Sequence, residues 1–155
     1  MENDIKKIIY EQREALNILY SLSDEELNQL APSFELLHFP AGSIVFKEGD
    51  SGNFLGFIVC GKLEVRKQTE FKGRQVVLAL LTKGSFVGEL NFFDERPRSA
   101  TVFVTEDSDL LILRRGAFDD FVQKYPYVGI KVLQGLNRVL SIRLRKAVER
   151  FAEIF

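Results

Sequence analysis

Hydrophobic positions change their spacing twice along the chain, and these changes divide it into three segments. From about Asp4 to Ser21, apolar residues recur at helical spacing, which predicts an amphipathic helix. Ser23 and Glu26 have the spacing of a capping box, so a second short helix is expected to begin there and to stop near Pro32. The apolar residues of the first helix are Ile5, Ile8, Ile9, Leu16, Leu19 and Tyr20.

From Phe34 to Leu113, short β-type runs alternate with turn residues such as Pro40-Ala41-Gly42. Phe71-Lys72-Gly73 is predicted to form the tip of a hairpin. Cys60, beside Gly61, is predicted to be a small buried apolar residue rather than a reactive thiol. Roughly eight short strands with this punctuation predict a jelly roll or a related β-barrel. The clearest runs are Ser43–Lys47, Phe57–Val59, Lys62–Lys67, Gln75–Leu81, Thr101–Thr105 and Asp109–Leu113.

The last segment returns to helical spacing, with a short helix over Gly116–Lys124 and a long one from about Val128 to the terminus. An apolar stripe on the long helix packs either on its own barrel or against a twin helix, and the helix is too long for a small barrel to cover. We therefore expect a homodimer through this helix. Its basic excess is expected to be a solvated face, with an anionic partner surface as the alternative. The basic residues are Lys131, Arg138, Arg143, Arg145, Lys146 and Arg150, against only Glu149 and Glu153. The stripe is Leu133, Leu136, Leu140, Leu144, Ala147, Phe151 and Ile154.

Composition restricts the class of protein. A chain of 155 residues with 46% hydrophobic and 28% charged residues is typical of one soluble globular domain. A net charge of −1 argues against direct binding to DNA. The sequence has neither an apolar run long enough to span a membrane nor the start of a secretory signal. A single cysteine suits a reducing compartment, so a cytoplasmic location is expected.

The sequence contains few residues that could form a catalytic site. A metalloenzyme of the β-barrel class needs several histidines or carboxylates around its metal, whereas His38 is the only histidine and has the context of a surface or structural residue. No histidine lies near Ser99 in the sequence, and only His38 could serve as its base, so a Ser-His nucleophile is not expected. We predict no catalytic residues, no metal site and no cofactor.

The most informative stretch is FVGELNFFDERPRSATV, residues Phe86 to Val102, called the cassette below. Gly88 permits close approach of the backbone to a ligand, and Glu89 offers a paired acceptor for a sugar hydroxyl. Residues 90–93 have room for one helical turn with free amides. Arg98 supplies a planar fork for phosphate oxygens, followed by the hydroxyl of Ser99. Taken singly, these residues also fit a surface ion pair beside a turn.

The order and spacing of these residues resemble the phosphate-binding cassette of the cyclic nucleotide-binding domain family. The resemblance implies that Glu89 takes the ribose 2′-hydroxyl and that Arg98 takes the cyclic phosphate. Asn53 stands where the family often has Asp, and we expect this position to shape a turn. The ligand-binding residues implied are Gly88, Glu89, Leu90, Asn91, Arg98, Ser99 and Ala100.

The family resemblance implies a mainly β fold with flanking helices: a cyclic-nucleotide-binding jelly-roll barrel, N-terminal helices and a long C-terminal helix. One domain is expected, made of an N-terminal helical segment (1–33), a barrel (34–114) containing the cassette (86–102), and C-terminal helices (115–155) that serve as lid and dimerisation element. The resemblance also implies that the protein is a sensor for a cyclic nucleotide, cAMP rather than cGMP, and that it acts on an unknown downstream protein.

Two alternatives stay open. One alternative to a stand-alone sensor is a nucleotide-independent scaffold that keeps the fold. The other is the sensor fragment of a larger transcription regulator, channel or kinase, although the Met1 start favours an intact short protein. For the sensor, we expect Arg98 to be partly buried without an adequate partner unless water or Glu89 engages it. Phe92 and Phe93 are expected to transmit closure of the cassette to the terminal helices.

Overall fold

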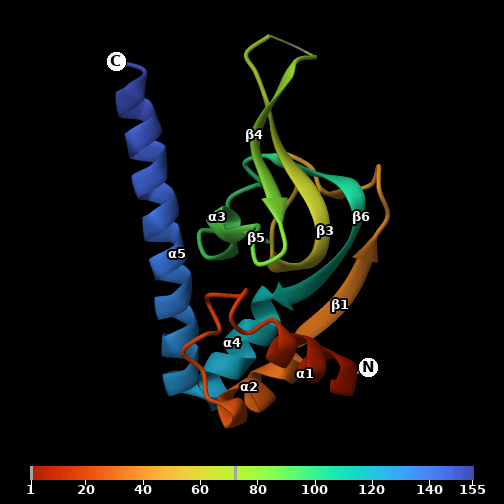
Figure 1. Cartoon of the computed structure of the whole chain (residues 1–155), viewed down its shortest axis with the longest axis vertical. Coiled ribbons are helices and arrows are strands. Elements are labelled where there is room, and N and C mark those ends of the chain that lie inside the picture. Colours follow the sequence, from red (N-terminus) through yellow and green to blue (C-terminus); the bar gives the residue numbers. More distant parts are fainter. Residues whose placement is uncertain (1, 72) are drawn as a thin grey trace.

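The computed structural model describes residues 2–71 and 73–155, and it contains one antiparallel sheet flanked by helices (Figure 1). The strands hydrogen-bond in the order β1-β6-β3-β4, with β2 on β6 and β5 on β3. The fold is thus mainly β with flanking helices, as predicted. In chain order the elements are α1 (Glu2–Glu11), α2 (Asp24–Leu30), η1 (Ala31–Ser33), β1 (Phe34–Phe39), β2 (Ile44–Phe46), β3 (Phe54–Gln68), β4 (Gln75–Thr82), β5 (Phe86–Val87), α3 (Glu89–Phe92), β6 (Thr101–Arg114), α4 (Arg115–Lys124) and α5 (Pro126–Glu153).

The described residues form six strands rather than the eight or so expected, because two pairs of predicted strands are continuous. β3 covers both 57–59 and 62–67, and its pairing with β6 shifts register between Ile58 and Leu63. Gly61, with φ of 97°, lies in this irregular stretch. A bulge bends a strand without ending it, so turn-like residues inside β3 and β6 were wrongly interpreted as strand ends. The predicted tip at 71–73 includes Lys72, which lies outside the described residues.

The first helix is shorter than predicted. α1 ends at Glu11, and residues 12–21 form a series of turns. These turns bury Leu16, Ile18 and Leu19 against the helical layer, whereas Tyr20 is exposed. The carbonyl of Ile18 lies so close to Gly135 of α5 that no Cβ would fit there. The prediction of one helix to Ser21 was wrong because consecutive turns bury residues at a spacing similar to that of a helix.

The second helix begins where the capping box predicted. The amide of Glu26 donates to Ser23 Oγ over 3.2 Å, and the amide of Ser23 donates to Glu26 Oε2 over 2.8 Å. Leu22 and Leu27, on either side of the cap, are both buried. Local sequence therefore determines this helix start.

The core has two parts that meet along β3. Phe57 points into a cluster with the helices, which includes Phe34, Phe118 and Leu136. Its neighbour Ile58 points into a second cluster inside the roll, as alternation along a strand requires. β3 therefore connects the interior of the roll to the helical layer beneath it.

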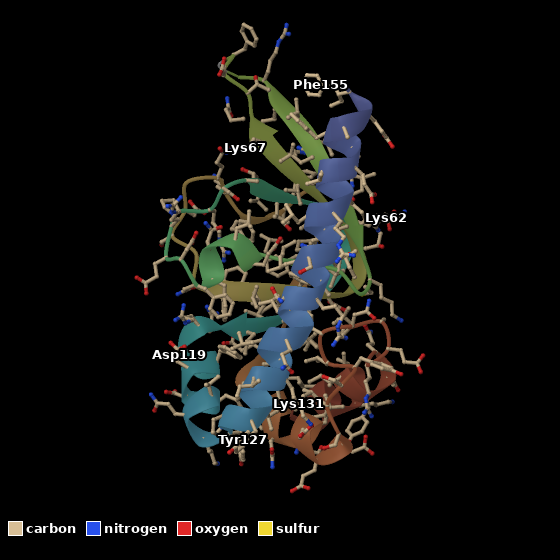
Figure 2. All side chains as sticks on the ribbon, turned by 90° about the vertical axis from the view of Figure 1, so that its left-hand side faces the viewer. Lys62, Lys67, Asp119, Tyr127, Lys131 and Phe155 are labelled. Atoms are coloured by element: carbon tan, nitrogen blue, oxygen red, sulfur yellow. The ribbon has the colours of Figure 1, made fainter. Side chains whose placement is uncertain are left out.

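α5 runs the length of the molecule, with Tyr127 near one end and Phe155 just beyond the other (Figure 2). Its first half is packed, because Val128, Val132 and Leu136 are buried. The predicted stripe continues into the second half, where Leu144 is 66% and Phe151 64% exposed. The barrel therefore leaves the distal half of the stripe uncovered. None of the described helices is long and apolar enough to cross a membrane.

The cysteine prediction was wrong. Cys60 is exposed, and its Sγ atom lies 3.5 Å from Asp109 Oδ2. The register shifts on both sides of Cys60 turn its side chain out of the alternation expected for a core residue. His38 is exposed, and its Nδ1 atom lies 2.7 Å from Asp109 Oδ1. The three side chains therefore lie on the outside of the sheet.

Candidate functional site

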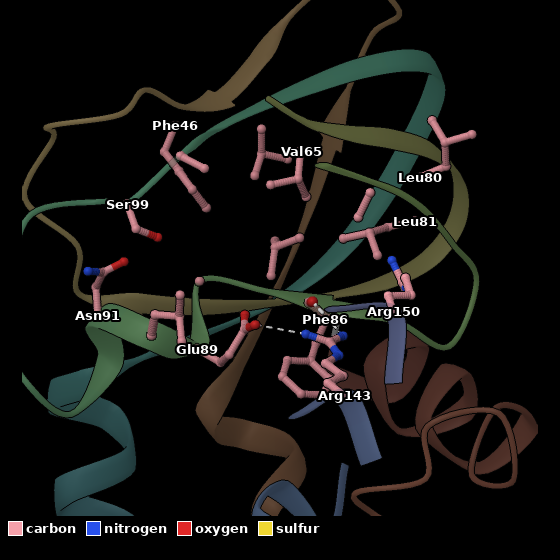
Figure 3. A pocket seen from close by; sticks show the side chains of 16 residues that line it. Phe46, Val65, Leu80, Leu81, Phe86, Glu89, Asn91, Ser99, Arg143 and Arg150 are labelled. Atoms are coloured by element: carbon pink, nitrogen blue, oxygen red, sulfur yellow. Dashed lines mark hydrogen bonds and ion pairs between the residues drawn. The ribbon is translucent and has the colours of Figure 1, made fainter. Parts of the chain in front are cut away.

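A cavity of about 340 Å³ lies between the cassette, β4 and α5 (Figure 3). Six of the seven predicted ligand-binding residues line it, namely Gly88, Glu89, Leu90, Asn91, Ser99 and Ala100. β4 contributes Ala79, Leu80 and Leu81, and α5 contributes Arg143 and Arg150. We call this cavity the cassette pocket.

The cassette begins with a backbone conformation that suits glycine. Gly88 has φ of 88°, and a Cβ atom there would lie 2.6 Å from the Phe54 carbonyl oxygen and 2.5 Å from Arg98 Nη1. The single helical turn predicted at Leu90–Phe93 follows at once as α3, one residue earlier than expected. Gly88 therefore sets the direction in which the first turn of α3 leaves β5.

Asn91 and Ser99 lie at the same end of the pocket (Figure 3). Asn91 Nδ2 donates to the Pro97 carbonyl over 2.6 Å, so its side chain closes the loop between α3 and β6. The Ser99 carbonyl accepts a hydrogen bond of 2.7 Å from Lys67 Nζ, and Lys67 also pairs with Glu48 over 2.5 Å. Ser99 itself is exposed, so its hydroxyl is accessible from the pocket.

Arg98 is placed differently from the other predicted residues. It is 2% exposed and does not line the pocket. Its Nη1 donates to the Gly88 carbonyl over 3.1 Å and its Nη2 to the Phe54 carbonyl over 3.0 Å. The rings of Phe46 and Phe54 lie 4.0 and 4.6 Å from its Cζ atom. The guanidinium therefore lies directly behind Gly88, on the inner side of the cassette.

The hydrogen bonds of Arg98 are incomplete. Its buried Nε finds no acceptor among the described residues, and no carboxylate of that part of the chain lies within ion-pair distance. Burial lowers the pKa of the Arg98 guanidinium, and the charges of Glu89 and Asp50 partly oppose this. Backbone carbonyls, rather than Glu89, are thus the partners that the structure gives to this cation.

Glu89 is paired with the C-terminal helix. Its Oε1 accepts a hydrogen bond of 2.8 Å from Arg143 Nη1 (Figure 3). Arg143 Nη2 also donates to the Phe86 carbonyl over 3.1 Å, and its Cζ lies 4.0 Å from the centroid of the Phe86 ring. Arg143 therefore fastens α5 to the start of the cassette.

Arg143 and Arg150 were missed as pocket residues. Both were included in the basic excess of the long helix, which was interpreted as a solvated face. Their spacing of seven residues, two helical turns, places them on one side of α5. That spacing alone did not indicate which side faces the barrel.

The far side of the cassette contacts α4. The ring of Phe92 lies 5.8 Å from that of Phe118, and the ring of Phe93 lies 6.1 Å from it. Arg115 Nη1 donates to the Phe92 carbonyl over 2.6 Å and Arg115 Nε pairs with Asp119 over 2.9 Å. A displacement of α3 would therefore change its contacts with the first turn of α4.

Comparison with known proteins agrees with this geometry. The family profile of the cyclic nucleotide-binding domain matches residues 36–125. The cyclic AMP receptor protein of Thermus thermophilus is 32% identical over 130 residues, which cover 84% of this chain and 58% of that protein. A cAMP-dependent protein kinase regulatory subunit of Hypocrea atroviridis is 30% identical over 125 residues, which cover 76% of this chain and 26% of the subunit.

The fold has matches among solved structures. A cyclic nucleotide-binding domain from Methylobacillus flagellatus superposes with a TM-score of 0.88 at 29% identity, covering 97% of this chain and 85% of that one. The chain spans less than two thirds of the length of the two relatives named above. The match to the family profile covers more than half of the chain and includes the whole cassette. The chain therefore belongs to the cyclic nucleotide-binding domain family.

Proposed function

We propose that this chain is a regulatory sensor for a cyclic purine nucleotide, with cAMP preferred over cGMP, and that it has no catalytic activity of its own. The observation that carries the proposal is the convergence of six predicted ligand-binding residues on one pocket, with Arg98 directly behind it. The names of the relatives, a cyclic AMP receptor protein and a cAMP-dependent kinase subunit, support the preference for cAMP.

The pocket suggests an orientation for the ligand. The cyclic phosphate would lie against the first amides of α3 and the hydroxyl of Ser99, at one end of the pocket. Glu89 would accept a hydrogen bond from the ribose. The purine would then extend toward Leu80, Leu81 and Arg150, which lie at the other end (Figure 3). The apolar residues of β4 suit the faces of a purine ring.

Binding would exchange partners at two charged groups. A phosphate would offer the Arg98 guanidinium an anionic acceptor in place of neutral carbonyls, and charge-assisted hydrogen bonds are stronger. A ribose hydroxyl would compete for Glu89, which Arg143 now holds. The resulting movement of α3 would reach α4 through Phe92 and Phe93, and α5 through Arg143. The ligand drives this change to the extent that it binds the closed arrangement better than the open one.

Thermal unfolding with cAMP, cGMP and AMP tests the proposal. A ligand at about 100 times its dissociation constant stabilises a protein by roughly 2.7 kcal/mol, which raises the midpoint by several degrees at this size. We expect a shift with cAMP, a smaller shift with cGMP at equal concentration, and none with AMP. The absence of a shift with either cyclic nucleotide would contradict the sensor and favour the scaffold.

Hydrogen exchange tests the signalling step separately. We expect the amide protection of α4 and of the distal half of α5 to change when cAMP is added. If protection changes in the cassette alone, cAMP binds but the helices do not carry the signal.

The uncovered stripe on α5 supports a further part of the proposal, a homodimer through this helix. We also propose that the regulator acts on a downstream protein in the cytoplasm. The same exposed stripe would also serve the alternative, a scaffold that is indifferent to nucleotide.

A further inference from the structure

A second cavity lies on the other side of Phe86 and Arg143, which line both it and the cassette pocket. It measures about 200 Å³, opens to solvent, and is bordered by three segments that are far apart in the sequence: the N-terminal turns, the turn that leads into the cassette, and the middle of α5. We call it the rear cavity. Its lining residues are Leu16, Asn17, Ile18, Phe57, Gly84, Ser85, Phe86, Val139, Ile142, Arg143 and Lys146.

The walls of the rear cavity are held apart by backbone contacts. Gly84 has φ of 88°, and a Cβ there would lie 2.6 Å from the Ala15 carbonyl oxygen. Gly135 lies directly against the backbone of Ile18. Because backbone touches backbone at both places, the N-terminal turns cannot move further toward the cassette or toward α5. The cavity therefore persists between them instead of being closed by side-chain repacking.

The chemistry of the lining is one-sided. Most of the wall is apolar, whereas the charged groups are two cations, Arg143 and Lys146, one helical turn apart on α5. Arg143 is already paired with Glu89. Lys146 has no carboxylate within ion-pair distance in the described part of the chain. Among the described residues no acidic side chain lines the rear cavity, so its charge is complementary to an anion.

We propose that the rear cavity binds a small carboxylate with an apolar body, such as a short-chain fatty acid. The apolar part would lie among Ile18, Phe57 and Val139, and the carboxylate would accept hydrogen bonds from Lys146 and from Arg143. A nucleotide is a poor fit, because the rear cavity has the smaller volume of the two and lacks the free amides of α3.

A consequence for regulation rests on the proposed function. A carboxylate in the rear cavity would compete with Glu89 for Arg143, and would release Glu89 for the ribose of a cyclic nucleotide. Both ligands would then bind with positive cooperativity, each raising the affinity for the other by the same factor.

Titration of methyl-labelled protein with sodium hexanoate, in the absence of nucleotide, tests the site. 1-Hexanol serves as the neutral match. We expect saturable shifts of the Ile18, Val139 and Ile142 methyl resonances with hexanoate and weaker binding of hexanol. Equal affinity for the two compounds, no saturable shift, or shifts confined to Leu80 and Leu81 of the cassette pocket would overturn the proposal.

Variants identify the cation. Lys146→Gln is expected to weaken hexanoate binding about tenfold or more, as expected for loss of a hydrogen bond from a charged donor. Arg145→Gln is the matched control, because Arg145 is an exposed neighbour on α5 that lines neither cavity. Unchanged affinity in Lys146→Gln, or equal loss in Arg145→Gln, would contradict the assigned carboxylate contact.

The proposed cooperativity is tested by measuring the affinity for cAMP with and without hexanoate. Tighter cAMP binding in the presence of hexanoate supports the coupling. If hexanoate binds the rear cavity and leaves cAMP affinity unchanged, the coupling is wrong and the site stands. If cAMP does not bind at all, the proposed function fails, whereas the hexanoate titration still decides the second site.

Discussion

Arg98 carries a full positive charge in a place that water hardly reaches. Its two terminal nitrogens join the carbonyls of Phe54 and Gly88, so the same side chain connects the start of β3 with the start of α3. A Cβ atom at Gly52 would lie 2.6 Å from its Nε, so the adjacent loop also fits closely around it. At the scale of this residue, a role in stability accompanies the proposed contact with phosphate.

Replacement of Arg98 by lysine separates charge from geometry. Arg98→Lys keeps the cation but loses the fork that reaches two carbonyls, so we expect a loss of about 1–3 kcal/mol in the free energy of unfolding. We also expect a large loss of cyclic nucleotide affinity. Denaturant unfolding and calorimetric titration measure the two effects.

Arg96→Lys is the control, because Arg96 is an exposed residue of the same loop. Wild-type nucleotide affinity in Arg98→Lys would contradict a contact between Arg98 and the phosphate. If both substitutions reduced stability and nucleotide affinity equally, the effect would come from replacing any arginine of this loop by lysine and not from the buried guanidinium of Arg98.

At the scale of elements, Arg143 is the contact that fastens the distal part of α5 to the cassette. Arg143→Met keeps the aliphatic length and removes the hydrogen bonds to Glu89 and to the Phe86 carbonyl. We expect amide exchange in the distal half of α5 to accelerate by about tenfold, as expected when a hydrogen bond to a charged group is lost. Arg145→Met, on the same helix but outside the pocket, should exchange like the wild type. Equal protection in the two variants would show that Arg143 does not hold the helix.

A second polar contact joins α2 to α5, and it depends on pH. The hydrogen bond from Lys131 Nζ to Glu26 Oε1, 2.7 Å long, is the main cause that lowers the pKa of Glu26 below its ordinary value of 4.5, followed by the backbone hydrogen bond from Ser23. A carboxylate with a lowered pKa contributes stability that is present above about pH 4.5 and is lost as the pH falls through the folded-state value.

Glu26→Gln tests this contribution. We expect the variant to be less stable than the wild type at neutral pH, and the difference to shrink as the pH is lowered below 4.5. Denaturant unfolding of wild type and variant, at neutral pH and again below pH 4.5, measures the difference in the free energy of unfolding. A difference that stays constant with pH would show that the charge of Glu26 does not contribute.

Local patterns predicted the elements whose causes are local. The capping box at Ser23 and Glu26 fixed the start of α2 because both of its hydrogen bonds lie within four residues. The extent of α1 was not predictable in this way, since it depends on the contact of Ile18 with Gly135, which lies over a hundred positions away. The pairing of Glu89 with Arg143 was missed for the same reason, whereas the order of residues inside the cassette was sufficient to predict that most of them meet.

At the scale of the whole molecule, the uncovered half of α5 predicts self-association. Leu144 and Phe151 are on the exposed stripe, and a partner helix would bury them. The double substitution Leu144→Asp with Phe151→Asp should give a monomer at concentrations where the wild type is dimeric by sedimentation. Tyr127→Asp is the control, since Tyr127 is 82% exposed at the other end of the helix. A wild type that sediments as a monomer at all concentrations would refute the dimer.

The contact between Gly135 and Ile18 has a mechanical consequence. Because the proximal half of α5 is buried and Gly135 rests against backbone, a tilt of the helix would take this point as its fulcrum. At about 1.5 Å per residue, Arg143 lies about 12 Å from the fulcrum and Glu153 about 27 Å. A tilt that displaces Arg143 at the pocket therefore displaces the end of the helix roughly twice as far. In the proposed signalling step the helix would act as a lever with its long arm outside the barrel, so a change of contact at the Arg143 guanidinium would become a larger movement of the surface that a partner would meet.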